Sequence, residues 1–273
     1  QPLTLASGAV MKNRLMLAPL TNTQSHADGR LSDEEFRWLT MRAEGGFGLT
    51  MTCAAHVQRR GQGFPGQLGI WSDDHLPGLK RLADKIKAEG SLAVVQLHHA
   101  GIRSPEALIG ETPVGPSDHA ETGARGLSLE EVHQLRDDFI AAAVRAETAG
   151  YDGVEIHGAH GYIVCAFLSP GLNKREDAYG GTAENRARLL NEIIDGVRAA
   201  TKPGFTLGVR LSPERFDLDM AEIRALAGAI LTEGKVDFLD MSLWDVFSEA
   251  SDARFKGRRL IDVFAELPRK GCV

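Results

Sequence analysis

Three side chains that can move or share protons stand close together in the middle of the sequence: His157, His160 and Tyr162. An imidazole donates or accepts a hydrogen bond near neutral pH and can bind a metal ion, and a phenol can hand over a proton. Residues 154–156 are an apolar run that predicts a buried strand, so the three side chains follow a strand end on a glycine-containing bend. Active-site residues of α/β proteins gather at such positions, which favours a functional site over idle loop histidines.

Polar residues also close or follow three other apolar runs. These residues are Thr21, Gln96 and Arg210. If the runs are parallel strands, their carboxyl ends lie at one edge of the sheet, and the polar side chains converge with His157. The sequence therefore predicts one polar site that is assembled from four separate segments.

Strands and helices are predicted to alternate along the chain. The apolar runs predict strands at 15–19, 48–54, 92–97, 154–156, 206–211 and 238–242, and the start of a seventh at 271–273. Helical spacing and capping signals predict helices at 32–45, 77–89, 128–149, 182–200, 219–233 and 258–267, with a long excursion at 98–127. Two helices begin with the capping-box pattern, at Ser32 and Ser128. The residues expected to point inward from the helix 128–149 are Val132, Leu135, Phe139 and Val144.

This alternation requires a parallel sheet, because parallel strands are joined by crossover helices. Two architectures fit, a doubly wound open sheet and a (β/α)8 TIM barrel. The open sheet would favour a glycine-rich phosphate loop after the first strand, and residues 18–23 contain no GxGxxG pattern. The converging polar strand ends favour the barrel. Because only six full units are present, we expect residues 1–273 to be a single barrel domain without its last two units of roughly 60–80 residues.

The composition argues against several classes of function. The formal net charge of -6 argues against a nucleic-acid or anionic membrane surface. No apolar run is long enough to span a membrane, and we expect no signal peptide at the N-terminus. The cysteines Cys53, Cys165 and Cys272 are widely spaced, which indicates reduced thiols rather than disulfides or an iron–sulfur site. We therefore expect a cytoplasmic protein with small-molecule partners.

One long motif resembles a known family. The run EIHGAHGYIVCAFLSPGLNKREDAYGG, residues 155–181, is similar to the fourth-strand signature of the Old Yellow Enzyme family of NADH:flavin oxidoreductases. Shorter segments that follow the family's order are 12–14 with 17–21, 95–101 and 209–212. The resemblance implies an eight-stranded barrel that holds non-covalent FMN at its carboxyl end. It also implies reduction of an activated C=C bond by NADH or NADPH.

The resemblance assigns the flavin to residues at the strand ends. Arg210, which stays protonated, suits the N1/C2 carbonyl edge, where negative charge grows on reduction. Gln96 supplies the donor and the acceptor that a pyrimidine edge requires. Thr21 is implied as a donor to flavin O4 and as the residue that tunes its redox properties. Backbone contacts or close packing around the flavin are implied for Ala18, Pro19, Leu20 and Ala54.

The substrate side of the site falls, by the same resemblance, to the histidines and the tyrosine. His157 and His160 would donate to the carbonyl oxygen of an enone-type substrate, each contributing roughly 10²–10³ in rate as charge builds there. Tyr162 would give a proton to the α-carbon. The expected partners are this small molecule and, for a homo-oligomer, further copies of the chain. The groups that hold the FMN phosphate are expected in the seventh and eighth strands.

Two other interpretations stay open at this point. A metal-dependent barrel lyase or hydrolase would use the histidines, with His98 and His99 as further ligands, although no HExxH pattern is present. A barrel relative without catalysis would serve as a binding or structural module. Residues 173–179 are interpreted as shaping their own loop, and Trp244 as a side chain that lines the substrate pocket or packs.

Overall fold

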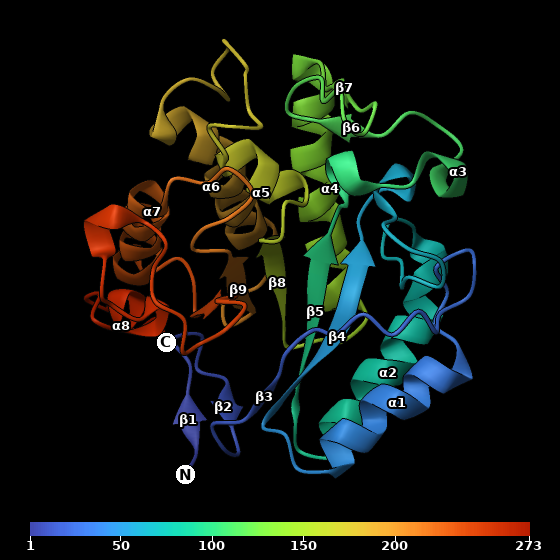
Figure 1. The fold of residues 1–273 in the computed structure, drawn as a ribbon. Helices are drawn as coiled ribbons and strands as arrows, with labels where there is room; N and C mark the ends of the chain where they lie inside the picture. The colour runs from blue at the N-terminus through green and yellow to red at the C-terminus, as the bar shows by residue number, and fades with distance from the viewer.

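A sheet of six parallel strands forms the framework of the computed structural model, which describes residues 1–273. The strands lie side by side in the order β3 (Met16–Leu17), β4 (Leu49–His56), β5 (Leu92–His98), β8 (Gly153–Gly158), β9 (Thr206–Leu211) and β10 (Phe238–Met241). Because all pairs are parallel, every carboxyl end lies at the same edge of the sheet (Figure 1). The six strands predicted from the apolar runs are confirmed, with bounds that differ by a few residues.

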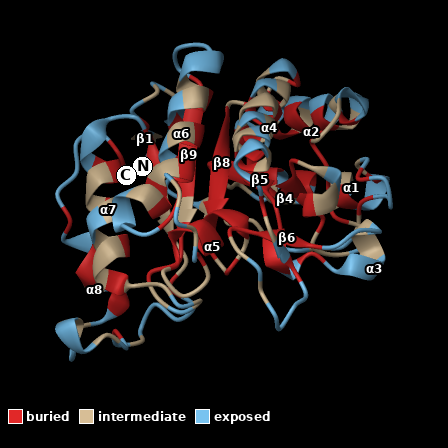
Figure 2. Cartoon of the chain, turned by 90° about the horizontal axis from the view of Figure 1, so that it is seen from above, coloured by how far each residue is buried: buried red, intermediate tan, exposed pale blue.

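Helices cover one face of the sheet and turn their buried sides toward it (Figure 2). They are α1 (Asp33–Glu44), α2 (Leu76–Ala88), α4 (Leu129–Thr148), α6 (Ala183–Ala200) and α7 (Met220–Glu233), with α8 (Leu260–Ala265) beside α7. The short helices α3 (Glu106–Ile109) and α5 (Ile163–Leu168) lie at the carboxyl edge, near the pair β6 (Val114–Gly115) and β7 (Arg125–Gly126). None of the helices combines the length and the hydropathy that a membrane-spanning helix requires.

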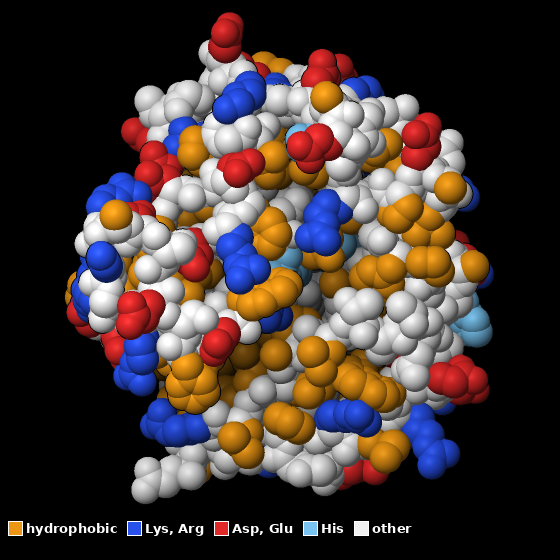
Figure 3. Space-filling model, in the orientation of Figure 1, with side chains coloured by type: hydrophobic (Ala, Val, Ile, Leu, Met, Phe, Trp, Pro, Cys, Tyr) orange, Lys and Arg blue, Asp and Glu red, His pale blue; other side chains and the backbone are white.

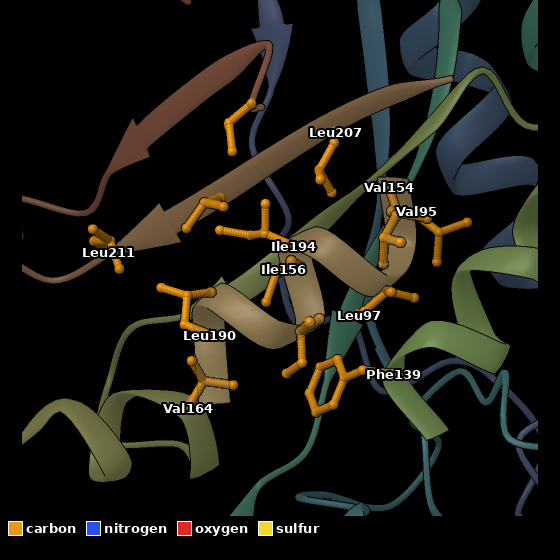
Figure 4. Packing of buried hydrophobic residues seen from close by; sticks show 14 of the residues in the cluster. Val95, Leu97, Phe139, Val154, Ile156, Val164, Leu190, Ile194, Leu207 and Leu211 are labelled. Carbon is orange, nitrogen blue, oxygen red and sulfur yellow. The ribbon is translucent and has the colours of Figure 1, made fainter. Parts of the chain in front are cut away.

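The two faces of each strand carry different side chains, as the two-residue period of a strand requires. Side chains that point toward the helices are apolar and belong to the main core, such as Val95 in β5 and Val154 and Ile156 in β8 (Figure 4). The residues between them, such as Glu155, point to the opposite face of the sheet. No helix covers that face (Figure 1). The polar residues of the candidate site share this uncovered face.

An apolar floor lies on the uncovered face, toward the amino ends of the strands. It is a cluster of Leu5, Met11, Leu49, Met51, Val94 and Phe238. The first two residues come from a hairpin of β1 (Leu3–Thr4) and β2 (Val10–Met11), which the sequence did not predict. Gly208 pairs in register with Phe238, and a Cβ on this glycine would collide with the phenylalanine ring. The missing side chain of Gly208 therefore leaves the space that the ring fills.

Two predictions about the helices are wrong in part. Ser32 caps α1 by accepting from the backbone N–H of Glu35, but the Glu35 carboxylate does not return the bond. It points into the core and accepts hydrogen bonds from Ser25 and Cys53, because Cys53 of β4 lies beneath α1. Val144, expected to point inward from α4, is 36% exposed. The residues that α4 does bury are Val132, Leu135, Phe139, Ala142, Ala143 and Ala146.

The sheet is a half-barrel with two open edges, so a closed (β/α)8 barrel is not present in residues 1–273. β3 and β10 end the strand order and do not pair with each other. Beside β10, Val273 donates its N–H to the carbonyl of Asp237 and accepts from the N–H of Leu239. This is the hydrogen-bond pattern of a parallel neighbour, as the predicted strand at 271–273 requires, although the segment is not a regular strand.

Candidate active site

Five of the residues expected in the site lie on the uncovered face at the carboxyl edge. Gln96 is on β5, next to β8, and cross-strand pairing places His157 of β8 beside Arg210 of β9. His160 and Tyr162 follow on the loop between β8 and α5. Figure 3 shows histidine side chains in a hollow in the middle of this face, with Lys and Arg side chains at its rim and hydrophobic side chains below it.

His157 of β8 and His160 of the following loop are hydrogen-bonded to each other. Nε2 of His157 lies 3.2 Å from Nδ1 of His160. The backbone N–H of Ala159 points at Nδ1 of His157 over 3.3 Å, and Nε2 of His160 lies 2.6 Å from Oγ of Ser242. All four ring nitrogens therefore have a partner within the protein.

The backbone of His160 adopts a conformation that few residues with a side chain adopt. Its φ is 62°, in the left-handed region, where the Cβ crowds the following carbonyl. The N–H of His160 donates to Oγ of Ser212 over 3.0 Å, and its carbonyl accepts from Arg103 over 2.6 Å. These two bonds stabilise the turn that brings the imidazole back over the strand end.

Burial keeps both imidazoles neutral. Loss of hydration lowers the pKa of His157 well below its ordinary value, and the neighbouring His98 and His160 add to the effect. Burial, followed by the positive charges of Arg210 and Arg103, lowers the pKa of His160 to about 4. A neutral imidazole carries one N–H, so each ring can donate one hydrogen bond.

Tyr162 packs edge-on among the histidines. Its ring centroid lies 4.3 Å from that of His98 and 5.1 Å from that of His157. The guanidinium of Arg103, from the short turn η3 (Gly101–Arg103), lies 5.0 Å from the ring centre. The ring is thus held on several sides, while its hydroxyl makes no hydrogen bond to the protein and can meet a bound molecule.

A layer of buried polar groups lies next to the histidines. Nε2 of Gln96 donates to Oε1 of Glu155 over 2.7 Å, and Nε of Arg210 lies 3.3 Å from Oδ2 of Asp240. Oε2 of Glu155 has no partner, and neither Nε of Arg210 nor Oδ2 of Asp240 has a well-oriented hydrogen bond. Burial raises the pKa of Glu155 well above its usual range, with a contribution from the charge of Asp240. Burial also raises the pKa of Asp240, against the opposing effect of Arg210.

The remaining expected flavin contacts lie toward the β3 edge. Ala54 of β4 pairs in register with Gln96. Ala18, Pro19, Leu20 and Thr21 follow β3 directly, and Leu20 is 52% exposed. No hydrogen bond joins the Thr21 side chain to the histidine cluster. The structure therefore brings Gln96, Arg210, the two histidines and Tyr162 together, and no side-chain hydrogen bond joins the segment 18–21 to that group.

Sequence reasoning missed three residues around the site and gave a fourth a different role. Glu155, Asp240 and Ser242 contact the expected site residues, and His98, considered earlier only as a metal ligand, packs against Tyr162. Nε2 of His98 is buried and has no partner. A signal existed for Glu155, which precedes His157 by two positions and so shares its face of the strand.

The loop 173–179 has the shaping contacts that the sequence suggested. The side-chain amide of Asn173 donates to the carbonyls of Phe167 and Tyr179, each over 2.8 Å. Arg175 pairs with Asp177 over 2.5 Å. These bonds fix the shape of the loop, and Arg175 also donates to the carbonyls of Pro116 and Leu127.

The histidines do not form a metal-binding cluster. No group of three or more His, Cys, Asp or Glu side chains has a geometry that could hold a metal ion. The ring of His99 is used elsewhere, because Nε2 lies 3.1 Å from the Gln58 side chain and Nδ1 accepts from the N–H of Gly101.

Trp244 is 74% exposed beneath the guanidinium of Arg215.

The buried layer fits the polar edge of a flavin ring. That edge presents carbonyl oxygens, an N–H group and a position that gains negative charge on reduction. Gln96 uses one amide N–H on Glu155 and keeps its carbonyl oxygen and second N–H, while Arg210 is a permanent cation with incompletely used donors. Fold and site together define an oxidoreductase that works with a flavin on a parallel α/β scaffold.

Comparisons with known proteins identify the family. The sequence model of the NADH:flavin oxidoreductase / NADH oxidase family matches residues 1–258. The probable NADH-dependent flavin oxidoreductase YqiG of Bacillus subtilis (strain 168) is 40% identical over 277 residues, which cover 97% of this chain and 74% of YqiG. The structure of the old yellow enzyme homologue from Zymomonas mobilis superposes with a TM-score of 0.85 and 30% identity, over 99% of this chain and 80% of that one. The structure of morphinone reductase in complex with tetrahydroNAD superposes with a TM-score of 0.79 and 30% identity, over 88% of this chain and 72% of that one.

The chain therefore belongs to the NADH:flavin oxidoreductase / NADH oxidase family, and the resemblance found in the sequence is confirmed. It is an oxidoreductase whose cofactors are FMN and NADH or NADPH.

Proposed function

We propose that this protein reduces the C=C bond of α,β-unsaturated carbonyl compounds, or of similarly activated alkenes, at the expense of NADH or NADPH. The observation that carries the proposal is the free hydroxyl of Tyr162 beside two neutral imidazoles, at the strand ends that also carry Gln96 and Arg210. FMN, when bound, supplies the capacity to take up and pass on hydride.

The residues proposed to hold FMN are those of the strand ends. Gln96 would bind the pyrimidine edge with the carbonyl oxygen and N–H that Glu155 leaves free. Arg210 would stabilise the negative charge at the N1/C2 edge. Thr21 would donate to O4 and tune the potential. The backbone and small side chains of Ala18, Pro19, Leu20 and Ala54 would pack close to the ring.

His157 and His160 are proposed to bind the substrate's carbonyl oxygen. An oxygen that enters between the rings replaces the hydrogen bond that now joins them, which frees an N–H for it. Such a donor stabilises the developing oxyanion more than the ground-state carbonyl, because it is already oriented and shielded from water.

Tyr162 is proposed to give the proton to the α-carbon of the substrate. Its ring is fixed by His98 and Arg103, while its hydroxyl has no competing partner. A general acid needs this combination of fixed position and unused proton.

We also propose that two further strand–helix units close the half-barrel into a (β/α)8 barrel in the whole protein and supply the FMN phosphate contacts. The β10 edge supports this, since Val273 already pairs there. An apolar groove of about 330 Å³ lies beside this edge, lined by Leu239, Met241, Val246, Ile261 and Phe264. Exposed apolar surface next to an open sheet edge is buried when a further strand or helix packs there. Equal FMN affinity of residues 1–273 and the full-length protein would contradict this proposal.

The proposed function is tested with the full-length protein and FMN. Reconstituted protein should be yellow, should bleach with NADH or NADPH without oxygen, and should regain its colour when 2-cyclohexen-1-one is added. Protein that takes up no flavin, or whose reduced flavin no enone reoxidises, would overturn the proposal.

A further inference from the structure

A second cavity lies at the carboxyl end of β4, apart from the candidate active site. Its volume is about 340 Å³, and α3 forms one of its walls. Figure 1 shows α3 on the side of the carboxyl edge that is away from β8. None of the residues proposed to hold FMN or substrate lines this cavity. Its apolar lining consists of Ala27, Leu108 and Ile109, beside the ring of Trp71.

His56, the last residue of β4, supplies an unpaired acceptor to the lining of the cavity. Its imidazole is buried, and Nδ1 lies 2.9 Å from the carbonyl oxygen of Gln58. A carbonyl oxygen can only accept, so Nδ1 carries the proton and Nε2 keeps a lone pair. Burial lowers the pKa of His56 to about 4, so the ring is neutral near pH 7. Nε2 is buried and has no partner.

Trp71 supplies an unpaired donor to the same lining. Its indole Nε1–H is buried and has no partner. Gly69 forms a parallel bridge with His56, and Trp71 follows Gly69 by two positions. Because residues two apart on an extended chain share a face, the side chains of Trp71 and His56 point to the same side.

Arg59, in the turn η1 (Arg59–Gly61), supplies a free positive charge. It is exposed, and its guanidinium makes no hydrogen bond or ion pair with the protein. Asp28, the acidic residue of the lining, already pairs with Arg30 over 2.8 Å. The cavity therefore combines one free cation with a buried donor and a buried acceptor.

We propose that this cavity is a second ligand site, which binds small hydroxy acids with an apolar substituent. The carboxylate pairs with Arg59, and the substituent packs on Leu108 and Ile109. The hydroxyl group donates to Nε2 of His56 and accepts from the indole N–H of Trp71. Buried polar atoms are nearly always hydrogen-bonded, and the hydroxyl group satisfies a donor and an acceptor that the protein leaves unmet. A single water molecule would also satisfy these two atoms, but it would leave the cation and the apolar wall unused.

Mandelate is a suitable probe, because phenylacetate lacks only its hydroxyl group and benzyl alcohol lacks its carboxylate. In the full-length protein with FMN, mandelate should shift the NMR signal of the Trp71 indole N–H with a dissociation constant of about 1 mM. Phenylacetate and benzyl alcohol should each bind about 2- to 10-fold more weakly. If about 10 mM mandelate leaves the Trp71 signal unmoved, the buried atoms bind only water and the proposal is overturned. A change in the FMN spectrum that follows the Trp71 signal would place mandelate in the flavin site and would also overturn it.

Two variants separate the parts of the recognition. Arg59→Ala should weaken mandelate binding by about 3- to 10-fold and keep the preference for mandelate over phenylacetate. Arg60→Ala is the matched control and should bind as wild type, because the neighbouring Arg60 pairs with Glu131 and does not line the cavity. His56→Phe removes the acceptor and should abolish the preference for mandelate.

Equal mandelate affinities of Arg59→Ala and Arg60→Ala would overturn the proposal, as would an undiminished preference for mandelate in His56→Phe. Because Arg59 is exposed, Arg59→Ala tests the site even if His56→Phe does not fold. The site is independent of the proposed reaction, so a protein that reduces no enone could still bind mandelate here.

Discussion

Gln96 and Glu155 face each other on neighbouring parallel strands, and the amide of Gln96 donates to the carboxyl group of Glu155 over 2.7 Å. Because burial raises the pKa of Glu155 well above its usual range, the folded protein holds this proton at pH values where the unfolded chain has released it. Deprotonation in the unfolded state therefore favours unfolding progressively as the pH rises above about 4.3. The carboxyl group orients Gln96 at a cost in stability near neutral pH.

Glu155→Gln should remove that cost and keep the contact, because the glutamine carbonyl can still accept from Gln96. The stability of the variant relative to wild type should rise between pH 4.5 and 8, by up to about 1.4 kcal/mol per pH unit for one proton. Urea unfolding across this range measures the difference. The exposed Glu121→Gln should show no such trend, and a constant difference in Glu155→Gln would contradict an uncharged Glu155.

Acid should destabilise the protein through its buried histidines. Folding lowers the pKa of His160 and of His56 to about 4, so between about pH 6.5 and 4 the unfolded chain binds protons that the folded state does not. Stability should therefore fall as the pH falls through this window. His160→Asn should reduce the slope of the free energy of unfolding against pH, by up to the amount that one bound proton contributes. Replacement of the exposed His26 by Asn should leave this slope as in wild type. Identical slopes for His160→Asn and wild type would show that His160 is protonated in the folded state.

Arg210→Ala should weaken FMN binding in the full-length protein by roughly 10- to 100-fold, the effect of losing charge-assisted hydrogen bonds. Fluorescence titration of apoprotein with FMN measures this. Arg210→Lys keeps the charge but lacks the planar guanidinium, so its affinity for FMN should lie between those of wild type and Arg210→Ala. Arg37→Ala, an exposed charge on α1, is the control, and equal affinities of Arg210→Ala and Arg37→Ala would remove Arg210 from the flavin site.

Tyr162→Phe should separate the two half-reactions. Reduction of bound flavin by NADH or NADPH needs no proton at carbon and should stay within a few-fold of wild type. Reoxidation by an enone should slow by roughly 10²–10⁴, the span of a positioned general acid. Reoxidation by oxygen serves as the internal control, since no carbon is protonated. Stopped-flow absorbance follows each step, and an undiminished enone rate would point to water or another loop residue as the proton source.

The strands, their order of appearance and the polar strand ends could be predicted from the sequence, because strand periodicity is local. The hairpin that carries Leu5 and Met11 could not, since its strands have two residues each and show no periodicity. The capping box predicted at Ser32 is wrong for a similar reason. Glu35 matches the sequence pattern, but its carboxylate bonds to Cys53 instead, and only the packing of α1 on β4 brings Cys53 near.

The same difference between local patterns and contacts of distant segments applies to the candidate site. His157, His160 and Tyr162 could be predicted as a cluster because they are neighbours in sequence. Asp240 and Ser242 reach Arg210 and His160 only through the pairing of β9 with β10, a relationship between distant segments that no local pattern encodes.

The ring of Phe238, which occupies the space beside Gly208, has an electrostatic consequence for the residues above it. A hydrocarbon layer polarises poorly, so charges next to it are screened much less than charges surrounded by water. Arg210 and Asp240 therefore act on a bound ring system with an asymmetric medium, wet on the carboxyl side and insulating beneath. The field that the two charges exert on a bound flavin would then depend on Phe238, which has no part in the reaction, and on Gly208, which leaves the space for its ring.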